Sequence, residues 1–379
     1  MSTTTGSCNE RFGRLQEEFA HRLETGHELG AALAVRVEGE SVVDLHGGWA
    51  DAVRATPWRA DTLVCVCSTT KTVIALAALL LADREELDLD APVSRYWPEF
   101  AAEQKDMIKV RHLLSHTSGL SGWQQPIALP DVYDWDTSTT RLATQAPWWE
   151  PGSTSGYHVI TFGHLIGEVI RRITGMRPGE FVARELAAPL GADFHIGLDP
   201  AEFHRVAELI PPAQPDVTSM PDPDGIQARS YTGPFPDFSQ FADERFRCAE
   251  IPAGNGHGTA EALARLQSIV SNRGSLGGRR LLGPHTLDRI FDVQSNGTDL
   301  VLGVPLRFGI GYALPCEATF PFIPDRRICF WFGAGGSFAV NDLDRRVTIT
   351  YVMNQMHPGL VSPNAAAYLT AAFEALDQL

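Results

Sequence analysis

Strand-like segments lie at both ends of this chain of 379 residues, and helix-like segments fill its middle. Alternating and β-branched apolar residues predict the strands, and Glu38-Gly39-Glu40 predicts a hairpin turn between the first two. The predicted strands cover 30–37, 41–49, 306–314, 328–333, 336–341 and 346–353. We therefore expect the two ends of the chain to share one antiparallel sheet, with the middle inserted as a helical domain.

Helical periodicity supports the same organisation. The predicted helices cover 12–25, 68–83, 109–115, 160–174, 178–187, 259–272, 284–293 and 363–377. Residues 211–236 hold seven prolines and little periodicity, which indicates a long loop. We expect a mixed α/β (α+β) fold, in which 1–90 and 251–379 form the sheet domain and 91–250 form the helical insertion. A cleft between two such parts is a natural ligand site.

The charge balance excludes several classes of protein. The chain carries 31 basic and 46 acidic residues, a net charge of −15, so it lacks the cationic footprint of a nucleic-acid or anionic-membrane binder. The first residues contain no apolar run of signal-peptide length, and the longest apolar stretch, Thr72 to Ala82, is about half a membrane span. We expect a cytoplasmic protein. No glycine-rich phosphate loop and no metal-ligand spacing is found, so the sequence predicts neither cofactor nor metal.

A candidate nucleophile opens the most apolar predicted helix. Ser68-Thr69-Thr70-Lys71 precedes TVIALAALLLAD, and residues three apart share a helix face, so Ser68 and Lys71 can be neighbours. Only three of the 31 basic residues are lysines. A lysine among apolar residues can lose its proton and act as a base, which a serine nucleophile needs. The alternative is a serine that caps the helix, followed by an exposed lysine.

Two further segments contain candidate site residues. Tyr157 follows the loop Glu150-Pro151-Gly152 and directly precedes a predicted helix, so its hydroxyl can point into a cleft. The segment 330–337 reads FWFGAGGS, and glycines in a strand-like region mark a close approach by a ligand or another backbone. A boundary tyrosine and a glycine-rich turn are the structural alternatives.

Taken in this order, the three segments resemble the serine β-lactamase and penicillin-binding-protein superfamily, in particular its class C-like branch and the family VIII carboxylesterases. The segment 111–120, RHLLSHTSGL, is similar to a characteristic stretch of that branch, and FHIGL at 194–198 is similar to the esterase subgroup. The resemblance spans about residues 20–375 and implies a mixed α/β domain with a helical insertion.

The resemblance also implies roles for individual residues. Ser68 is the expected nucleophile, Lys71 its base partner, and Tyr157 the tyrosine that shares proton transfer. The oxyanion hole would consist of the backbone N–H groups of Ser68 and Ala334, placed where negative charge develops. None of the histidines His112, His116, His158 and His257 is implied to form a Ser-His-Asp triad.

Two departures from the β-lactamase pattern bear on the substrate. The Lys-Thr-Gly motif is replaced by Trp331-Phe332-Gly333, which removes the cation that holds a substrate carboxylate, unless Arg326 or Arg327 supplies it. Val159 replaces the asparagine that bonds the substrate amide. Both changes favour small neutral esters over lactams and peptides. The residues expected to contact the substrate are Trp331, Phe332, Gly333, His158 and Trp123, although Trp123 can equally belong to the core.

The sequence thus predicts a serine carboxylesterase that forms an acyl-enzyme on Ser68. Three alternatives stay open: an acyltransferase on the same scaffold, a β-lactamase or D-amino-acid peptidase, and, more remotely, a binding protein without catalysis. The intact set of Ser68, Lys71 and Tyr157 argues against the last, because a pure binder needs no such set. The oligomeric state and the natural substrate are not predicted.

Overall fold

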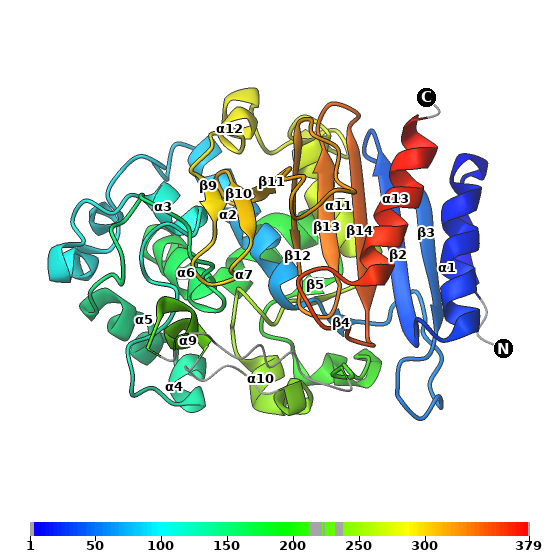
Figure 1. The fold of residues 1–379 in the computed structure, drawn as a ribbon, viewed down its shortest axis with the longest axis horizontal. Helices are drawn as coiled ribbons and strands as arrows, with labels where there is room; N and C mark the ends of the chain where they lie inside the picture. Colours follow the sequence, from blue (N-terminus) through cyan, green and yellow to red (C-terminus); the bar gives the residue numbers. More distant parts are fainter. Residues whose placement is uncertain (1–3, 213–221, 223, 232–237, 378–379) are drawn as a thin grey trace.

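The computed structural model describes residues 4–212, 222, 224–231 and 238–377. Within these residues nine strands form one antiparallel sheet in the order β1-β3-β2-β14-β13-β12-β11-β10-β9 (Figure 1). The strands are β1 (Thr4–Cys8), β2 (Gly30–Val37), β3 (Glu40–Gly48), β9 (Ser295–Thr298), β10 (Pro305–Phe308), β11 (Ala313–Leu314), β12 (Ile328–Phe332), β13 (Phe338–Asp342) and β14 (Val347–Met353). Strand β2 pairs with β14, with Leu33 opposite Tyr351. The prediction that both chain ends share one antiparallel sheet is therefore confirmed.

Short strands complete the β-structure. In the described part of the chain, β4 (Val64–Cys65), β6 (His257–Gly258) and β5 (Phe194–His195) form a small sheet, and β7 (Ser275–Leu276) pairs with β8 (Arg279–Arg280). The pairing of β4 with β6 matters for the site, because β4 leads directly into the segment that carries Ser68.

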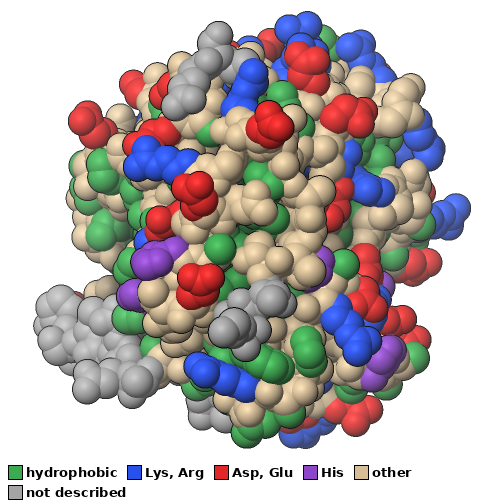
Figure 2. Space-filling view, turned by 90° about the vertical axis from the view of Figure 1, so that its right-hand side faces the viewer, with side chains coloured by type: hydrophobic (Ala, Val, Ile, Leu, Met, Phe, Trp, Pro, Cys, Tyr) green, Lys and Arg blue, Asp and Glu red, His purple; other side chains and the backbone are tan. Residues whose placement is uncertain are grey.

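Helices cover both faces of the large sheet. Helices α1 (Gly13–Thr25) and α13 (Pro363–Asp377) pack together on one face, and α11 (Ala260–Ser271) packs against β2, β13 and β14 on the other (Figure 1). Helix α2 (Thr70–Asp83) lies beyond α11 and contacts α6 (Thr161–Thr174). On the face that bears α1, acidic and basic side chains are mixed with apolar ones (Figure 2).

The remaining helices lie mostly between α2 and α11 in the sequence, and several of them form the end of the molecule opposite α1 and α13 (Figure 1). They are α3 (Val110–Leu114), α4 (Leu129–Tyr133), α5 (Trp135–Thr144), α7 (Pro178–Val182), α8 (Ala188–Leu190), α9 (Ile226–Tyr231), α10 (Glu244–Cys248) and α12 (Pro284–Arg289). Among the described residues no helix is both long and apolar enough to cross a bilayer.

Several local predictions were wrong. The strand predicted at 306–314 is two strands, because the chain turns at Gly309–Gly311, where Gly311 has a φ of +85° and the Gly309 N–H bonds the Tyr312 carbonyl. Strands β1 and β9 were not predicted, since both are mostly exposed and lack an apolar pattern.

Two helix predictions also need correction. Helix α12 ends at Arg289, four residues earlier than expected. The loop predicted at 211–236 contains the short helix α9, which Ser230 ties to Ser121 through a hydrogen bond of 2.7 Å between their hydroxyls. Parts of that predicted loop, 213–221, 223 and 232–236, lie outside the described residues.

Candidate active site

In the segment that contains the candidate nucleophile, a single residue is partly exposed to solvent. Ser68 lies in a 3-10 turn, Cys67–Thr69, between β4 and α2, and it is partly exposed, whereas every other residue from 62 to 81 is buried. The apolar run that follows Ser68 places α2 in the core, because such a helix is stable only when it is buried on all sides. Ser68 is thus the one point on this segment that a substrate can contact.

The Lys71 ammonium lies within hydrogen-bond distance of three oxygens. Nζ is 3.1 Å from Ser68 Oγ, 2.7 Å from the Val159 carbonyl and 2.9 Å from the Ala253 carbonyl. Lys71 is 2% exposed, and burial lowers its pKa well below the usual value for lysine. A neutral amine has two hydrogens and one lone pair. Because the two carbonyls can only accept, they take the two hydrogens, and the lone pair is left to face the Ser68 hydroxyl.

Tyr157 lies against both of these groups. Its ring centroid is 4.7 Å from Lys71 Nζ, and its hydroxyl oxygen accepts a hydrogen bond of 2.8 Å from Trp331 Nε1. Burial raises the pKa of Tyr157 above its usual range, while hydrogen bonds with Ser68 and Trp331 oppose that rise. The phenol is therefore protonated near neutral pH and can pass a proton between neighbours.

A second segment, which contacts the turn around Ser68, also has a single partly exposed residue. Ala334 is partly exposed, whereas every other residue from 328 to 342 is buried. The turn that carries Ala334 is bound to the segment around Ser68, since Ser337 Oγ donates to the Val66 carbonyl at 2.8 Å and lies 3.0 Å from Thr69 Oγ1. A Cβ on Gly333 would come within 2.4 Å of that same Val66 oxygen. Glycine there lets the two backbones meet.

The predicted substrate-binding residues separate into two groups. Trp331 and Phe332 are neighbours on β12, and side chains on a strand point to opposite faces. Trp331 therefore reaches Tyr157, whereas Phe332 is 2% exposed and stacks on Phe320 at 5.5 Å between ring centroids. The Phe332 side chain thus packs in the core, which does not favour a role in the site, and its contact with a substrate stays a prediction.

His158, which was also predicted to contact the substrate, is hydrogen-bonded within the protein. It is fully buried, its Nε2 lies 2.7 Å from Ser118 Oγ, and its Nδ1 lies 2.7 Å from the Gly156 carbonyl. Burial lowers its pKa to about 3, so the ring is neutral. Because both nitrogens already have partners, neither is free for a substrate, and the contact of His158 with a substrate stays a prediction.

Trp123 lines a cavity whose lining residues do not include Ser68, Lys71 or Tyr157. Its indole N–H donates to the Ser138 carbonyl at 3.1 Å, and the ring lines a surface cavity of about 440 Å³ together with Trp148 and Arg229. Its contact with a substrate stays a prediction.

Arg326 pairs with Asp342 at 3.5 Å, and Arg327 pairs with Asp288 at 2.6 Å, so the two arginines considered for a substrate carboxylate already have acidic partners.

Sequence reasoning gave no role to two residues that contact the Tyr157 segment. His116 lies with its ring centroid 4.8 Å from that of Tyr157, and the Asp299 carboxylate accepts the Tyr157 N–H at 2.9 Å. The segment 111–120 contains His116 and was singled out by resemblance, which could have drawn attention to it. Asp299 follows directly after the exposed strand β9, and no pattern in the sequence marks it as a site residue.

In the described residues no three His, Cys, Asp or Glu side chains form a metal-binding group.

Comparison with known proteins agrees with this geometry. A model of the family described as Beta-lactamase matches residues 15–373. The chain belongs to this β-lactamase family. Among its relatives, the esterase/β-lactamase LipL of Mycobacterium tuberculosis (strain ATCC 25618 / H37Rv) is 33% identical, over 96% of this chain and 86% of LipL. Esterase EstB of Burkholderia gladioli is 33% identical, over 69% of this chain and 71% of EstB.

A solved structure extends the similarity to the three-dimensional fold of this β-lactamase-family chain. The crystal structure of a family VIII carboxylesterase superposes with a TM-score of 0.91 and 36% identity, covering 98% of this chain and 100% of the other. The resemblance inferred from the sequence motifs is therefore confirmed at the level of family and fold.

Proposed function

We propose that this protein is a serine carboxylesterase that hydrolyses small neutral carboxylic esters through an acyl-enzyme on Ser68. The observation that carries the proposal is the environment of Lys71, whose two carbonyl partners leave its lone pair for the Ser68 hydroxyl. The esterase relatives and the family VIII structure support the same reaction class. Proposed roles are nucleophile for Ser68, base for Lys71 and proton carrier for Tyr157.

In acylation, Ser68 Oγ attacks the ester carbonyl as Lys71 Nζ takes its proton. The carbonyl oxygen becomes an oxyanion, which the N–H groups of Ser68 and Ala334 stabilise; each such donor typically lowers the barrier by about 3 kcal/mol. When the tetrahedral intermediate collapses, the carbon–oxygen bond to the alcohol breaks, and Lys71 returns its proton through the Tyr157 hydroxyl to the leaving oxygen.

Deacylation reverses the roles. Water takes the place of the departed alcohol, and the Lys71/Tyr157 pair removes its proton as the oxygen attacks the acyl carbon. The acid leaves and Ser68 recovers its proton. We place the cleft between the proposed parts 1–90 with 251–379 and 91–250, so that Ser68 and Ala334 belong to one part and Tyr157 to the other.

The preference for neutral esters rests on the third motif. An indole occupies the position of the lysine in Lys-Thr-Gly, and its N–H is already used by Tyr157. Arg326 and Arg327 are engaged by acidic residues, so a buried substrate carboxylate would lack a cation from them. β-Lactam hydrolysis is the second candidate, because LipL carries both names.

A substrate panel tests the proposal. We expect turnover of p-nitrophenyl acetate and butyrate, and far slower turnover of nitrocefin and D-alanine p-nitroanilide. The change Ser68→Ala should lower ester kcat roughly 10³-fold or more, and Lys71→Met and Tyr157→Phe about 10²- to 10⁴-fold. Product analysis with an added alcohol measures acyl transfer.

The chain offers a matched control for Lys71. Lys105 is also buried, but its Nζ donates to three backbone carbonyls, those of Ala102, Ala143 and Gln145. Lys105→Met should lower stability while leaving kcat per folded enzyme unchanged. Ester turnover that survives Ser68→Ala, or nitrocefin turnover faster than that of every ester, would contradict the proposal.

A further inference from the structure

Three consecutive amides around Tyr157 are bound by only two residues. The Gly156 N–H donates to the His116 carbonyl at 3.0 Å, and the His158 N–H donates to His116 Nδ1 at 3.1 Å. Between them, the Tyr157 N–H donates to Asp299 Oδ1 at 2.9 Å. This stretch is neither helix nor strand, so these contacts replace the regular ladder that fixes the backbone elsewhere.

His116 is held in an unusual backbone conformation. Its φ is +62°, in the left-handed region that non-glycine residues rarely adopt, and its side chain is 4% exposed. Its ring packs on Phe162 and Phe308, each with centroids 4.9 Å away, as well as on Tyr157. Strain of this kind costs about 1–3 kcal/mol and persists where the surroundings require it.

The tautomer of His116 follows from its partner. Nδ1 accepts a backbone N–H, so this nitrogen carries no hydrogen and the neutral ring has its proton on Nε2. Burial, His158 and Lys71 all lower the pKa of His116 well below its usual value. The acceptor at Nδ1 is therefore present throughout the pH range in which an esterase would operate.

Asp299 is a buried carboxylate held by amides. It is fully buried, and Oδ1 accepts the N–H groups of Tyr157, Val301 and Leu302, each at 2.9 Å. Oδ2 is buried and has no hydrogen-bond partner among the described residues.

The loop that contains Asp299 also donates a hydrogen bond to the segment before Tyr157. The Leu300 N–H donates to the Ser155 carbonyl at 2.9 Å, so the loops 299–302 and 155–157 exchange hydrogen bonds in both directions. His116 accepts hydrogen bonds from the residues on either side of Tyr157, and Asp299 accepts one from Tyr157 itself. A displacement of Tyr157 would break all of these contacts together.

We propose that His116 and Asp299, which we call the Tyr157 clamp, are positioning residues that hold the phenol against Ser68, Lys71 and Trp331. The proposal deepens the proposed function, since it rests on proton transfer by Tyr157. A hydroxyl displaced by 1 Å can cost about 10²-fold in rate. The clamp fixes the backbone from which that hydroxyl extends.

The charge of Asp299 has a second effect. The charged and titratable groups around the phenol are Lys71, His116, His158, Tyr231 and Asp299. His116 and His158 are neutral. Burial is the main cause of the raised pKa of Tyr157, and the negative charge of Asp299 adds to it because it disfavours the tyrosinate. Asp299 thus adds to the effect of burial, which keeps the proton on Tyr157 and leaves Lys71 as the proposed base.

Paired variants of Asp299 separate contact from charge. Asp299→Ala removes the acceptor, and we expect kcat for p-nitrophenyl butyrate to fall roughly 10- to 100-fold, with KM nearly unchanged. Asp299→Asn keeps an oxygen acceptor and removes the charge. It should retain most of kcat at the optimum.

Paired variants of His116 separate the side-chain acceptor from backbone strain. Glycine relieves the strain at positive φ but lacks the acceptor, so His116→Gly should lower kcat about as much as Asp299→Ala. Asparagine tolerates positive φ, and its Oδ1 is bonded to Cγ, as Nδ1 is in histidine. His116→Asn should therefore keep most of the kcat that His116→Gly loses.

Amide exchange provides a readout that does not depend on turnover. Exchange in a peptide covering 155–159 should quicken in Asp299→Ala and His116→Gly, while a peptide from α2 stays at the wild-type level. The clamp is overturned if both variants keep kcat within about twofold of wild type, or if Asn and Ala at position 299 lose activity and global stability equally, as a purely structural residue would. If the wild type hydrolyses no ester, the proposed function fails, and exchange at 155–159 alone decides the clamp.

Discussion

At the scale of single residues, Trp331 occupies the position that the lysine of Lys-Thr-Gly has in the β-lactamase pattern. The family's lysine at this position is a cation that can hold a substrate carboxylate. The indole removes that charge and turns its N–H toward the Tyr157 hydroxyl oxygen, 2.8 Å away. A donor at that oxygen leaves the phenol's own hydrogen free for Ser68 or the leaving alcohol, because one lone pair is already used.

Trp331→Phe tests this role. Phenylalanine keeps an aromatic ring in the contact with Tyr157 but removes the N–H, and the loss of one such hydrogen bond, about 1.4 kcal/mol, corresponds to about tenfold in rate. We therefore expect kcat on p-nitrophenyl butyrate to fall about tenfold, with little change in KM. In a Tyr157→Phe background the same change should have almost no effect; an equal effect in both backgrounds would contradict it.

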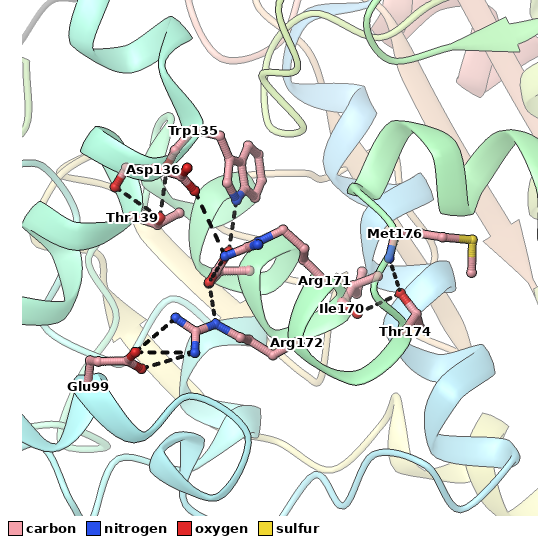
Figure 3. A network of polar contacts seen from close by, with 10 residues as sticks. Glu99, Trp135, Asp136, Thr139, Ile170, Arg171, Arg172, Thr174 and Met176 are labelled. Atoms are coloured by element: carbon pink, nitrogen blue, oxygen red, sulfur yellow. Dashed lines mark hydrogen bonds and ion pairs between the residues drawn. The ribbon is translucent and has the colours of Figure 1, made fainter.

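At the scale of elements, a buried carboxylate joins α5 to α6. Glu168 in α6 is 1% exposed and accepts hydrogen bonds from Trp135 Nε1 at 2.8 Å, from Arg171 at 2.7 Å and from Arg172 at 2.6 Å (Figure 3). Arg172 continues to Glu99 at 3.1 Å. Since Tyr157 and Val159 precede α6, this network stabilises the helix that follows the proposed proton carrier.

Glu168→Ala should lower the free energy of unfolding by about 2–3 kcal/mol, because it leaves a buried indole N–H and two partly buried guanidinium groups without their acceptor. Urea denaturation measures the loss. The matched control is Glu99→Ala, which removes only an exposed pair and should cost about 0.5 kcal/mol or less. If the two changes lower the free energy of unfolding equally, the buried acceptor contributes no more than the exposed pair.

At the scale of the whole molecule, the sheet and its outer helices meet at a buried acid. Glu28 is 2% exposed and accepts hydrogen bonds from the hydroxyls of Tyr351 in β14 and Tyr368 in α13. Its second oxygen has no partner among the described residues. Burial raises its pKa to about 7, above the ordinary value of 4.5.

Stability should therefore fall as pH rises across this window. Below pH 4.5 Glu28 holds its proton in the folded and unfolded states alike, whereas between 4.5 and 7 only the folded state keeps it. The folded chain loses about 2–3 kcal/mol relative to the unfolded chain over that range. Glu28→Gln removes the titration, so its stability relative to wild type should rise by that amount from pH 4.5 to 8. Parallel profiles for the two proteins would refute the assignment.

Features formed by residues close together in the chain were predicted from the sequence better than contacts between distant residues. Ser68 and Lys71 are three residues apart at a helix start, so backbone geometry alone brings them together, and the structure places them 3.1 Å apart. The sheet and most helices were predicted for the same reason, because periodicity is a local signal. Strands β1 and β9 lack that signal and were missed.

The amino-acid sequence by itself determined the family, the sheet shared by both chain ends and the pairing of Ser68 with Lys71. Only the tertiary structure decided that Trp331 reaches Tyr157, that Phe332 turns into the core, and that Asp299 and His116 hold Tyr157. The Tyr157–Asp299 and Tyr157–Trp331 contacts span 142 and 174 residues of chain. Contacts of that span depend on how the whole core packs, and no local pattern encodes them.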